Sequence, residues 1–431
     1  MDANVIGNEG ALGNPGEKQF RLGHRLNLPP FFGNAIDLST GETAKQIAPH
    51  LYEIDKWEQV TNTYYLRSCA REILFSYRDG EGNYVYRVCK CGHMMNASRG
   101  VDVYRSLIRQ SALFAGVITC GSVWHCPVCA TKITLRRRAE LDLGIKRHLH
   151  NGGVCALMTC TLPHNRTEKL AENMKKIQDV YRLLFSSRSG EKLRQKYNVC
   201  GQIRSIEITN GINGWHPHVH TILLMNSPQN FREMGDELYA KWRDAAAKKY
   251  GYDLPRIALD LRGGNEAANY ITKWSLSHEL THIYAKKARQ NESQTTWQLL
   301  ALAAENNSVA REKWEEFATT VSRPAYEGNV KSTRQLVWSR GLKSHYDLQE
   351  KSDEKIAEEI LDPGYFMGNL DQNDWQKIRA ERRYDPRIVI LQLAQTGSWQ
   401  DVRDFVDSLP DPTHTNQQNY RSFFALRGGN F

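Results

Sequence analysis

The stretch at residues 214–224 reads Gly-Trp-His-Pro-His-Val-His-Thr-Ile-Leu-Leu, and it decides the fold that we predict. Its histidines stand at alternate positions, and successive side chains of a β-strand point to opposite faces of the sheet. One face of the predicted strand therefore carries His216, His218 and His220. Two imidazoles on one strand face can bind a single metal ion. A histidine-rich edge strand with satisfied side chains is the alternative interpretation.

The preceding residues favour the metal site. Residues 205–214 read Ser-Ile-Glu-Ile-Thr-Asn-Gly-Ile-Asn-Gly, a strand followed by turn residues, which is typical of a β-hairpin. Folding this hairpin puts Glu207 roughly opposite His218, on the polar face. We therefore predict a divalent metal site held by Glu207, His218 and His220, with His216 as a less certain ligand. Mixed oxygen and imidazole ligands suit Mn²⁺ or Mg²⁺.

A second candidate segment lies at residues 263–274, where Gly-Gly-Asn-Glu-Ala-Ala-Asn-Tyr-Ile-Thr-Lys-Trp predicts a helix capped by Asn265. Residues three and four apart share a helix face, so Glu266, Tyr270 and Lys273 lie together. On its own this face could be a solvated surface. Coupled to the metal hairpin, the Tyr270 hydroxyl becomes a candidate nucleophile, because a nearby metal ion and Lys273 would favour its phenolate.

These motifs together resemble those of the His-hydrophobe-His endonucleases. Within that superfamily the chain resembles the rolling-circle replication initiators of small bacterial plasmids. The histidine strand followed by Tyr270-x-x-Lys273 is similar to their second and third motifs. Residues 157–163, Leu-Met-Thr-Cys-Thr-Leu-Pro, are similar to the first. The resemblance spans about residues 89 to 342.

The resemblance implies a site-specific endonuclease and strand transferase acting on single-stranded DNA. Tyr270 would attack the scissile phosphate, leaving a 5′-phosphotyrosine and a free 3′-hydroxyl that primes DNA synthesis. Glu266, in a Glu-x-x-x-Tyr relation, would activate water at termination. The implied partners are a plasmid double-strand origin and a host helicase and polymerase, in the cytoplasm. We find no phosphate-binding loop motif, so we expect that the chain is not its own ATP-driven helicase. Phosphate-ester exchange conserves bond energy and so would need no nucleotide cofactor.

Three alternatives remain open. A single-strand transposase uses the same chemistry, but some carry a second tyrosine one helical turn away, where this chain has Glu266. A conjugative relaxase usually has its tyrosine before the histidines, whereas Tyr270 follows them. From a different class, the chain could be a non-enzymatic, zinc-containing nucleic-acid-binding protein.

The nine cysteines are the next informative feature. Cys126-Pro127-Val128-Cys129 is a metal knuckle, and four thiolates that include one Cys-x-x-Cys pair fit structural Zn²⁺. We predict Cys120 as the third ligand and Cys91 as the fourth. The substitutes for the fourth position are Cys89, His93 and His125. Buried free thiols are the alternative, and we expect that role for Cys69, Cys155, Cys160 and Cys200.

The formal net charge of +9 and sequence pI near 9.0 favour a polyanionic partner over a membrane. Residues 351–431 carry 13 Asp/Glu and 10 Lys/Arg, a net −3, which leaves +12 for residues 1–350. A basic helix is predicted from Lys132 to His148. Its residues Arg136, Arg137 and Arg138 are candidates for binding DNA phosphates, unless they form a merely solvated face. Residues 110–131 lack charge but are rich in polar residues, so we reject a transmembrane helix there.

From residue 154 the pattern predicts β-α-β-β-α-β, the ferredoxin-like arrangement of an α+β fold. The predicted strands are 154–161, 202–209, 215–225 and 256–262. We also expect a long helix over 296–321 and a packing strand or turn at 336–342. The predicted segments are a disordered tail (1–45), a zinc- and DNA-binding module (46–150), the endonuclease core (151–290), a helical extension (291–350) and a small acidic helical tail domain (351–431).

Overall fold

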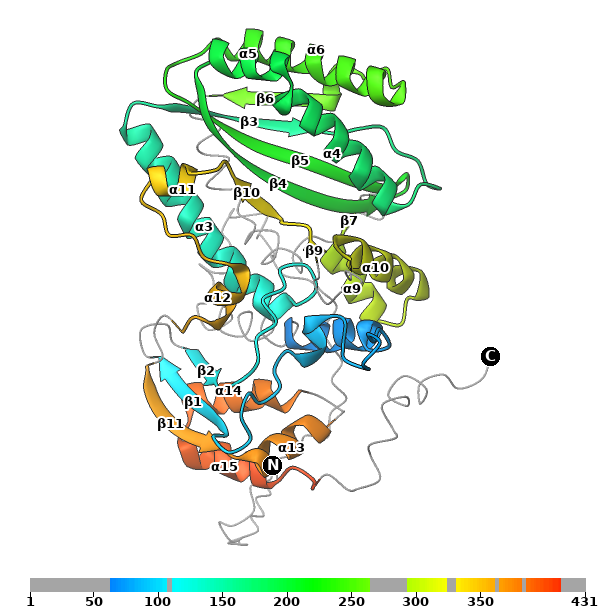
Figure 1. The fold of residues 1–431 in the computed structure, drawn as a ribbon. Helices are drawn as coiled ribbons and strands as arrows, with labels where there is room; N and C mark the ends of the chain where they lie inside the picture. The colour runs from blue at the N-terminus through cyan, green and yellow to red at the C-terminus, as the bar shows by residue number, and fades with distance from the viewer. Residues whose placement is uncertain are drawn as a thin grey trace, which may run out of the picture.

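A computed structural model gives the fold (Figure 1). The described residues are 63–106, 111–263, 293–323, 331–360, 364–381 and 385–411. The predicted disordered tail and the predicted helix with Glu266, Tyr270 and Lys273 lie outside these ranges, so both remain predictions.

The central sheet has six strands. They are β3 (Val154–Cys160), β4 (Val199–Gly211), β5 (Gly214–Met225), β6 (Leu259–Gly263), β7 (Gln294–Thr295) and β10 (Leu336–Trp338). Five of them follow the order β10-β4-β5-β3-β6, while β7 pairs with β4, and all of these pairings are antiparallel. The predicted α+β class is therefore confirmed.

The predicted hairpin forms the centre of this sheet. β4 and β5 join through Ile212 and Asn213, and Glu207 pairs directly with His218 in the register. Ile206 and Ile208 are buried on the opposite face, as alternation predicts.

Helices α4 (Leu170–Ser186) and α6 (Phe231–Tyr250) cover the face opposite the histidines, next to the short α5 (Arg188–Lys196) (Figure 1). The apolar positions at helical spacing that predicted α4 are all buried: Leu170, Met174, Ile177, Tyr181 and Leu184. Helix α6 ends at Gly251, which adopts a left-handed conformation with φ 71°.

The histidine face is covered at one end. Helix α3 (Pro127–His150) packs Leu141 and Ile145 against Ile222 and Leu224, which continue the histidine side of β5. The segment with α11 (Leu342–His345) joins the same core. The aliphatic half of this face is thus buried, and the polar half carries the candidate site.

Two predictions about secondary structure were wrong. The expected long helix at 296–321 is two helices, α9 (Thr296–Ala304) and α10 (Ser308–Val321). Asn306 between them is left-handed with φ 68°, and the side chain of Asn307 caps α10. The strand expected from residue 256 begins only at Leu259, because a 3-10 turn, η2 (Arg256–Ala258), precedes it and leaves Ile257 85% exposed.

One cysteine also departs from expectation. Cys69, Cys155 and Cys160 are buried as predicted, but Cys200 is exposed. The register of β4 against β5 shifts between Val199 and Gly201, and this bulge turns the Cys200 side chain out of the core.

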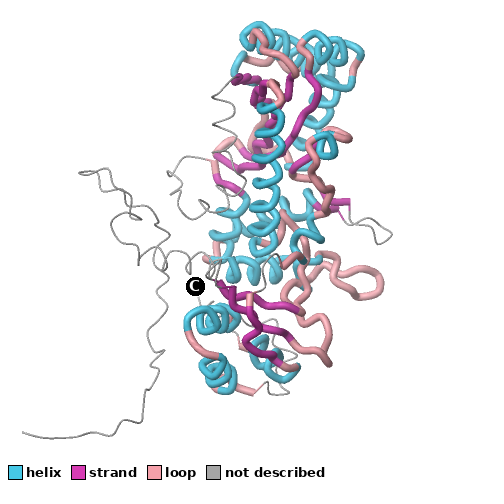
Figure 2. The backbone as a smooth tube through the Cα atoms, turned by 90° about the vertical axis from the view of Figure 1, so that its left-hand side faces the viewer, coloured by secondary structure: helices cyan, strands magenta, loops and turns pink. Residues whose placement is uncertain are grey.

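A second sheet forms from distant parts of the chain. It contains β1 (Val101–Ser106), β2 (Ser111–Ala115) and β11 (Tyr365–Leu370), in the order β11-β1-β2. Three helices pack beside it (Figures 1 and 2): α13 (Gln372–Ala380), α14 (Pro386–Thr396) and α15 (Trp399–Asp407). They share a separate core with Val101, Val103 and Leu370. The boundary predicted at residue 351 therefore separates strands that hydrogen bond to each other, and the tail is not purely helical.

The remaining elements are short. They are helical residues 63–74, η1 (Arg87–Lys90), β8 (Ser322–Arg323), β9 (Lys331–Ser332) and α12 (Asp353–Glu358). Among the described residues, no helix has the length and apolar character needed to cross a bilayer.

Candidate functional site

The polar half of the histidine face is built from three adjacent strands. His218 and His220 come from β5, Glu207 from β4 and Thr159 from β3. The Nε2 atom of His220 lies 3.0 Å from Glu207 Oε2, and its Nδ1 atom lies 3.0 Å from Thr159 Oγ1. His220 is buried, so these two hydrogen bonds fix the orientation of its ring.

The imidazoles form a continuous row on this face. The rings of His216 and His218 have centroids 4.0 Å apart, and those of His218 and His220 are 5.9 Å apart. A fourth ring, that of His164, stacks on His216 at 4.2 Å with 24° between the planes. His164 is not among the predicted site residues, although it directly follows the Thr-x-Thr-x-Pro motif.

Two of these rings, His216 and His218, favour the neutral form. Burial, followed by the neighbouring rings of His218 and His164, lowers the pKa of His216 to about 3. Burial also lowers the pKa of His218. The Nδ1 atom of His218 is buried and has no hydrogen-bond partner among the described residues. Neutral imidazole is the form that binds metal ions, so this set of donors is compatible with a divalent cation.

The histidine face is nevertheless not a closed ligand cage. Within the described ranges, only one group of three or more His, Cys, Asp or Glu side chains brings its donor atoms within 4.8 Å of one another, and it is Cys91, Cys120, Cys126 and Cys129. Glu207, His218 and His220 share a face but are more open, and an open ligand set leaves positions for substrate or water.

The four cysteines meet where helix α3 begins. Cys126 is the N-cap of α3, Cys129 lies in its first turn, and Cys91 directly follows η1. The Sγ atom of Cys91 is 3.6 Å from Cys126 and 3.8 Å from Cys129, and Cys120 is 3.6 Å from Cys129. Four sulfurs bound to zinc at about 2.3 Å form a tetrahedron with edges of about 3.8 Å. The spacing therefore fits one Zn²⁺ ion.

The pKa shifts differ among the four thiols: the pKa is lowered at Cys91 and Cys129, and burial raises it at Cys120 and Cys126. Hydrogen bonds from the other thiols, together with the Arg67 guanidinium, lower the pKa of the Cys91 thiol. A thiolate is the form that ligates zinc.

The three substitutes that the sequence left open are engaged elsewhere. Cys89 contacts the Leu74 carbonyl at 3.6 Å, and burial raises its pKa to about 11. The ring nitrogens of His125 contact Ser122 Oγ at 3.1 Å and the Ala318 carbonyl at 3.0 Å. The Nε2 atom of His93 lies 3.1 Å from an Arg71 nitrogen, and His93 is not part of the group of converging thiols.

A buried charge network adjoins the cysteines. A Cβ atom added to Gly92 would lie 2.8 Å from a nitrogen of Arg387 and 3.1 Å from a nitrogen of Arg67, so both guanidinium groups touch the residue next to Cys91. Both arginines bond to Asp385. No sequence pattern indicates this network, because Arg67 lies 318 residues from Asp385.

The predicted DNA-binding arginines of α3 differ in their surroundings. Arg137 is held by Glu140 and Asp353, each at 2.9 Å, and so fastens α12 to α3. Arg136 and Arg138 form longer contacts with acids on α3 and keep more of their side chains exposed.

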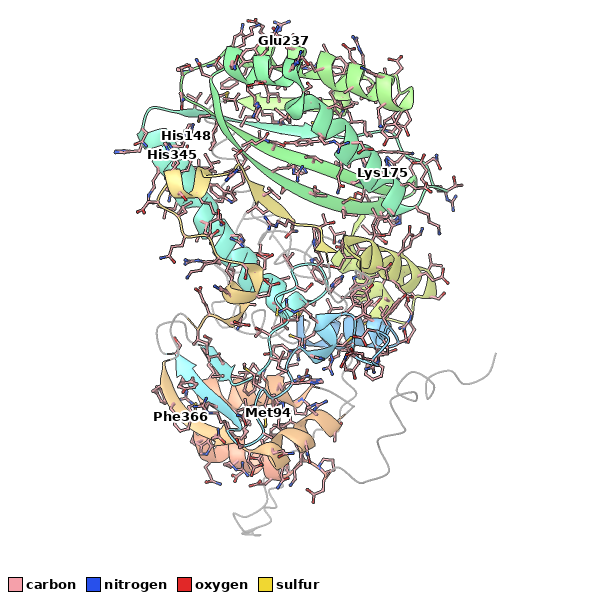
Figure 3. All side chains as sticks on the ribbon, in the orientation of Figure 1. Met94, His148, Lys175, Glu237, His345 and Phe366 are labelled. Carbon is pink, nitrogen blue, oxygen red and sulfur yellow. The ribbon has the colours of Figure 1, made fainter. Side chains whose placement is uncertain are left out.

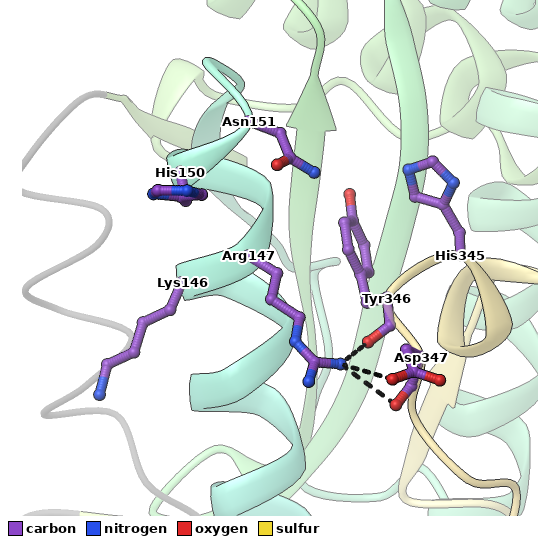
Figure 4. Close-up of a pocket in the computed structure, with 7 residues that line it drawn as sticks. All are labelled: Lys146, Arg147, His150, Asn151, His345, Tyr346 and Asp347. Carbon is purple, nitrogen blue, oxygen red and sulfur yellow. Dashed lines mark hydrogen bonds and ion pairs between the residues drawn. The ribbon is translucent and has the colours of Figure 1, made fainter.

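The far end of α3 carries a further group of basic residues. Figure 3 places His148 and His345 at this end. A cavity of about 600 Å³ opens there, lined by Lys146, Arg147, His150, Asn151, His345, Tyr346 and Asp347 (Figure 4). Arg147 already donates to the Tyr346 and Asp347 carbonyls, so it fastens α3 to the segment after α11.

Comparison with known proteins gives matches over the part of the chain that contains the histidine face. Residues 113–251 match the family described as replication protein, a span that holds Glu207, His218, His220 and three of the clustered cysteines. A protein rep from Streptomyces lividans is 28% identical over 233 residues, covering 42% of this chain and 51% of that relative. A neomycin resistance protein from Streptomyces cyanogenus is 28% identical over 156 residues, covering 30% of this chain and 36% of that relative.

These matches are partial. The chain spans about half the length of the first relative and less of the second. No solved structure matches the chain. The resemblance to replication proteins that the motifs predicted is confirmed for the central part of the chain.

Proposed function

We propose that this chain, whose residues 113–251 match the replication protein family, is a site-specific single-stranded DNA endonuclease and strand transferase that initiates rolling-circle replication of a plasmid. The observation that carries the proposal is the polar face on which Glu207 and His218 pair across two strands, with His220 hydrogen bonded to Glu207. The order β6-β3-β5-β4, with α4 and α6 on one side, supports a ferredoxin-like core of the His-hydrophobe-His type.

Glu207, His218 and His220 would hold the catalytic ion in this proposal, with His216 as a further candidate. When bound, Mn²⁺ or Mg²⁺ supplies Lewis-acid polarisation of the scissile phosphate. The protein's own contribution is orientation. The Thr159 hydroxyl engages Nδ1 of His220, so Nε2, which faces Glu207 Oε2 at 3.0 Å, is the nitrogen that would ligate the ion. Burial lowers the pKa of His218 and so favours its neutral form.

Tyr270 is the proposed nucleophile, and the end of β6 constrains where it can lie. Gly263 pairs with Ala156, and Ala156 pairs with Leu223, five residues along β5 from His218. At roughly 3.3 Å per residue along a strand and roughly 4.8 Å between strands, His218 lies about 19 Å from Gly263. Tyr270 follows seven residues after Gly263, so the predicted helix that carries it would start near this end of the sheet.

The proposed reaction is a phosphate-ester exchange. The Tyr270 phenolate oxygen forms a bond to phosphorus, and the bond between phosphorus and the 3′-oxygen breaks. The 3′-oxygen takes a proton and leaves as a hydroxyl, while the 5′-phosphate stays on the tyrosine. Lys273 would favour the phenolate, and because one ester bond replaces another, no nucleotide cofactor is required.

The remaining assignments follow from this role. The Cys91, Cys120, Cys126 and Cys129 cluster would hold structural Zn²⁺ and so fix the start of α3. Arg136 and Arg138 on that helix would contact DNA phosphates, with Arg137 serving mainly structure. The partners would be a plasmid origin, a host helicase and a host polymerase, in the cytoplasm.

The decisive experiment looks for the covalent bond. Full-length protein is incubated with end-labelled single-stranded oligonucleotides of randomised sequence and Mn²⁺, and protein-linked fragments are separated on a denaturing gel. We expect an adduct for the native protein and for Tyr365→Phe, a control at an exposed tyrosine. Tyr270→Phe should give none while still binding DNA.

An adduct of normal yield in Tyr270→Phe would refute the assignment of the nucleophile. DNA binding with no adduct from the native protein, in either Mn²⁺ or Mg²⁺, would instead favour the non-enzymatic, zinc-containing DNA-binding protein.

A further inference from the structure

The row of imidazoles extends beyond the proposed metal ligands. It begins at His220 in the sheet and continues through His218 and His216, and among the described residues its ring contacts end at His164. His164 belongs to the loop between β3 and α4, not to the sheet, and it is half-buried. A loop residue has thus been brought face to face with a strand residue.

The loop is held in this position by backbone geometry. A Cβ atom at Gly214 would lie 2.9 Å from the Asn165 carbonyl oxygen and 3.1 Å from the Arg166 Cα, so the loop packs directly against the hairpin. Gly214 also has φ +89°, which favours glycine. The Asn165 side chain accepts hydrogen bonds from the Thr167 backbone nitrogen and hydroxyl at 3.0 and 2.7 Å. The stack is therefore preorganised by its surroundings.

The geometry of His164 and His216 suits stacking. The two rings lie nearly parallel, with 24° between their planes and 4.2 Å between their centroids. Flat rings of this kind are what single-stranded nucleic acids stack on, because every base has a π face. Arg166 and Lys169 are exposed on the same loop and can attract the phosphates on either side of a stacked base.

We propose that His164, backed by His216, is the stacking platform for one base of the single DNA strand, next to the phosphate held by the metal face. This inference rests on the proposed function for the identity of the ligand, but it concerns recognition and not cleavage. His164 is a positioning residue: it sets which phosphate enters the site by fixing the base beside it.

The test measures binding without chemistry. All variants are made in the Tyr270→Phe protein, and affinity for a fluorescently labelled strand, taken from the captured cleavage products, is measured by anisotropy in EDTA. If no strand can be captured, a mixed-sequence single strand is used. His164→Ala should weaken binding about 5- to 150-fold, the range for loss of one base–aromatic stack. His164→Phe should restore most of the affinity, and His150→Ala, which removes an exposed imidazole on α3, should change nothing.

A second arm locates the base. Abasic sites are introduced one at a time along the strand. With the Tyr270→Phe protein, an abasic site at one position should weaken binding far more than an abasic site at its neighbours. In His164→Ala that abasic site should cause no further loss. Unchanged affinity in His164→Ala, or an equal abasic penalty with and without the imidazole, would overturn the proposal. These outcomes do not depend on whether an adduct forms. They therefore distinguish failure of the stacking proposal from failure of the proposed cleavage mechanism.

Discussion

Asp385 is a carboxylate on which two buried guanidinium groups converge, and its neutralisation should release the carboxy-terminal helices from the rest of the protein. Arg387 contacts it through two bonds of 2.6 Å, and Arg67 contacts it at 3.3 Å. The side chains of Arg67, Asp385 and Arg387 are only 3%, 8% and 9% exposed. Solvent therefore screens these charges little, unlike those of a surface pair.

The expected cost of Asp385→Asn is about 3–5 kcal/mol, the range for removing one partner of a buried ion pair. Two charge-assisted hydrogen-bonding partners at about 1.5–3 kcal/mol each lead to a similar figure. Asparagine keeps the shape of the side chain, so a packing cavity does not contribute. The loss of stability should weaken the contacts between helical residues 63–74 and α14, which Asp385 joins.

The measurement is hydrogen exchange followed by mass spectrometry on the zinc-loaded protein. Peptides from residues 63–74 and from α14 should lose protection in Asp385→Asn, while peptides from β3 to β5 should keep theirs. Asp411→Asn is the matched control, because Asp411 pairs with Lys377 at an exposed site where ion pairs contribute little. Unchanged protection in Asp385→Asn, or a loss below about 1 kcal/mol, would refute the electrostatic reasoning.

Four further outcomes are expected. Burial alone would raise the pKa of Asp385, but Arg387 and Arg67 outweigh burial and lower that pKa. The stabilisation is therefore present above the unfolded value near 3.8 and is lost as pH falls through the folded value. In acid unfolding experiments, the stabilities of native protein and Asp385→Asn should converge as pH falls. His220→Ala, or EDTA with native protein, should remove most cleavage but leave DNA binding, and full cleavage after exhaustive dialysis against EDTA would contradict the metal site. Cys129→Ser should lower zinc below about one ion per chain and destabilise the region around α3, whereas Cys69→Ser should keep the zinc. Glu266→Ala should retain the first nick and its adduct but lose hydrolytic release at termination, and release at the native rate would leave Glu266 with only a structural role.

The sequence predicted features whose signal is local. Alternation along residues 214–224 and the adjacent turn residues were enough to predict the β4–β5 hairpin and the pairing of Glu207 with His218. The cysteine knuckle predicted the thiol cluster, because Cys-x-x-Cys spacing at a helix start brings two sulfurs together whatever the rest of the fold does. The broken helix at Asn306 and Asn307 also had a local signal, since asparagine favours caps and left-handed conformations.

Other features depend on register between distant segments, which one sequence cannot supply. The hydrogen bond between Thr159 and His220 requires β3 to pair with β5 in one particular alignment across 61 residues. The contact of His164 with His216 requires a loop to approach a turn at a glycine. Neither pairing has a periodicity that could be read from one segment alone.

The long-range pairing of β1 with β11 changes how the acidic tail is understood. The path from Cys91 to β1 is short, and β1 pairs along its length with β11, so the tail is tied to the zinc module by a sheet. The same tail reaches back to the residue beside Cys91 through Arg387, which donates to the Gly92 carbonyl at 3.5 Å. The thiol cluster, the buried ion network and the second sheet thus adjoin one another. The four cysteines themselves belong to the same hydrophobic core as α4 and α6, whereas the tail has a core of its own. Loss of zinc should therefore loosen both the start of α3 in the main core and, through Gly92 and Arg387, the attachment of the tail.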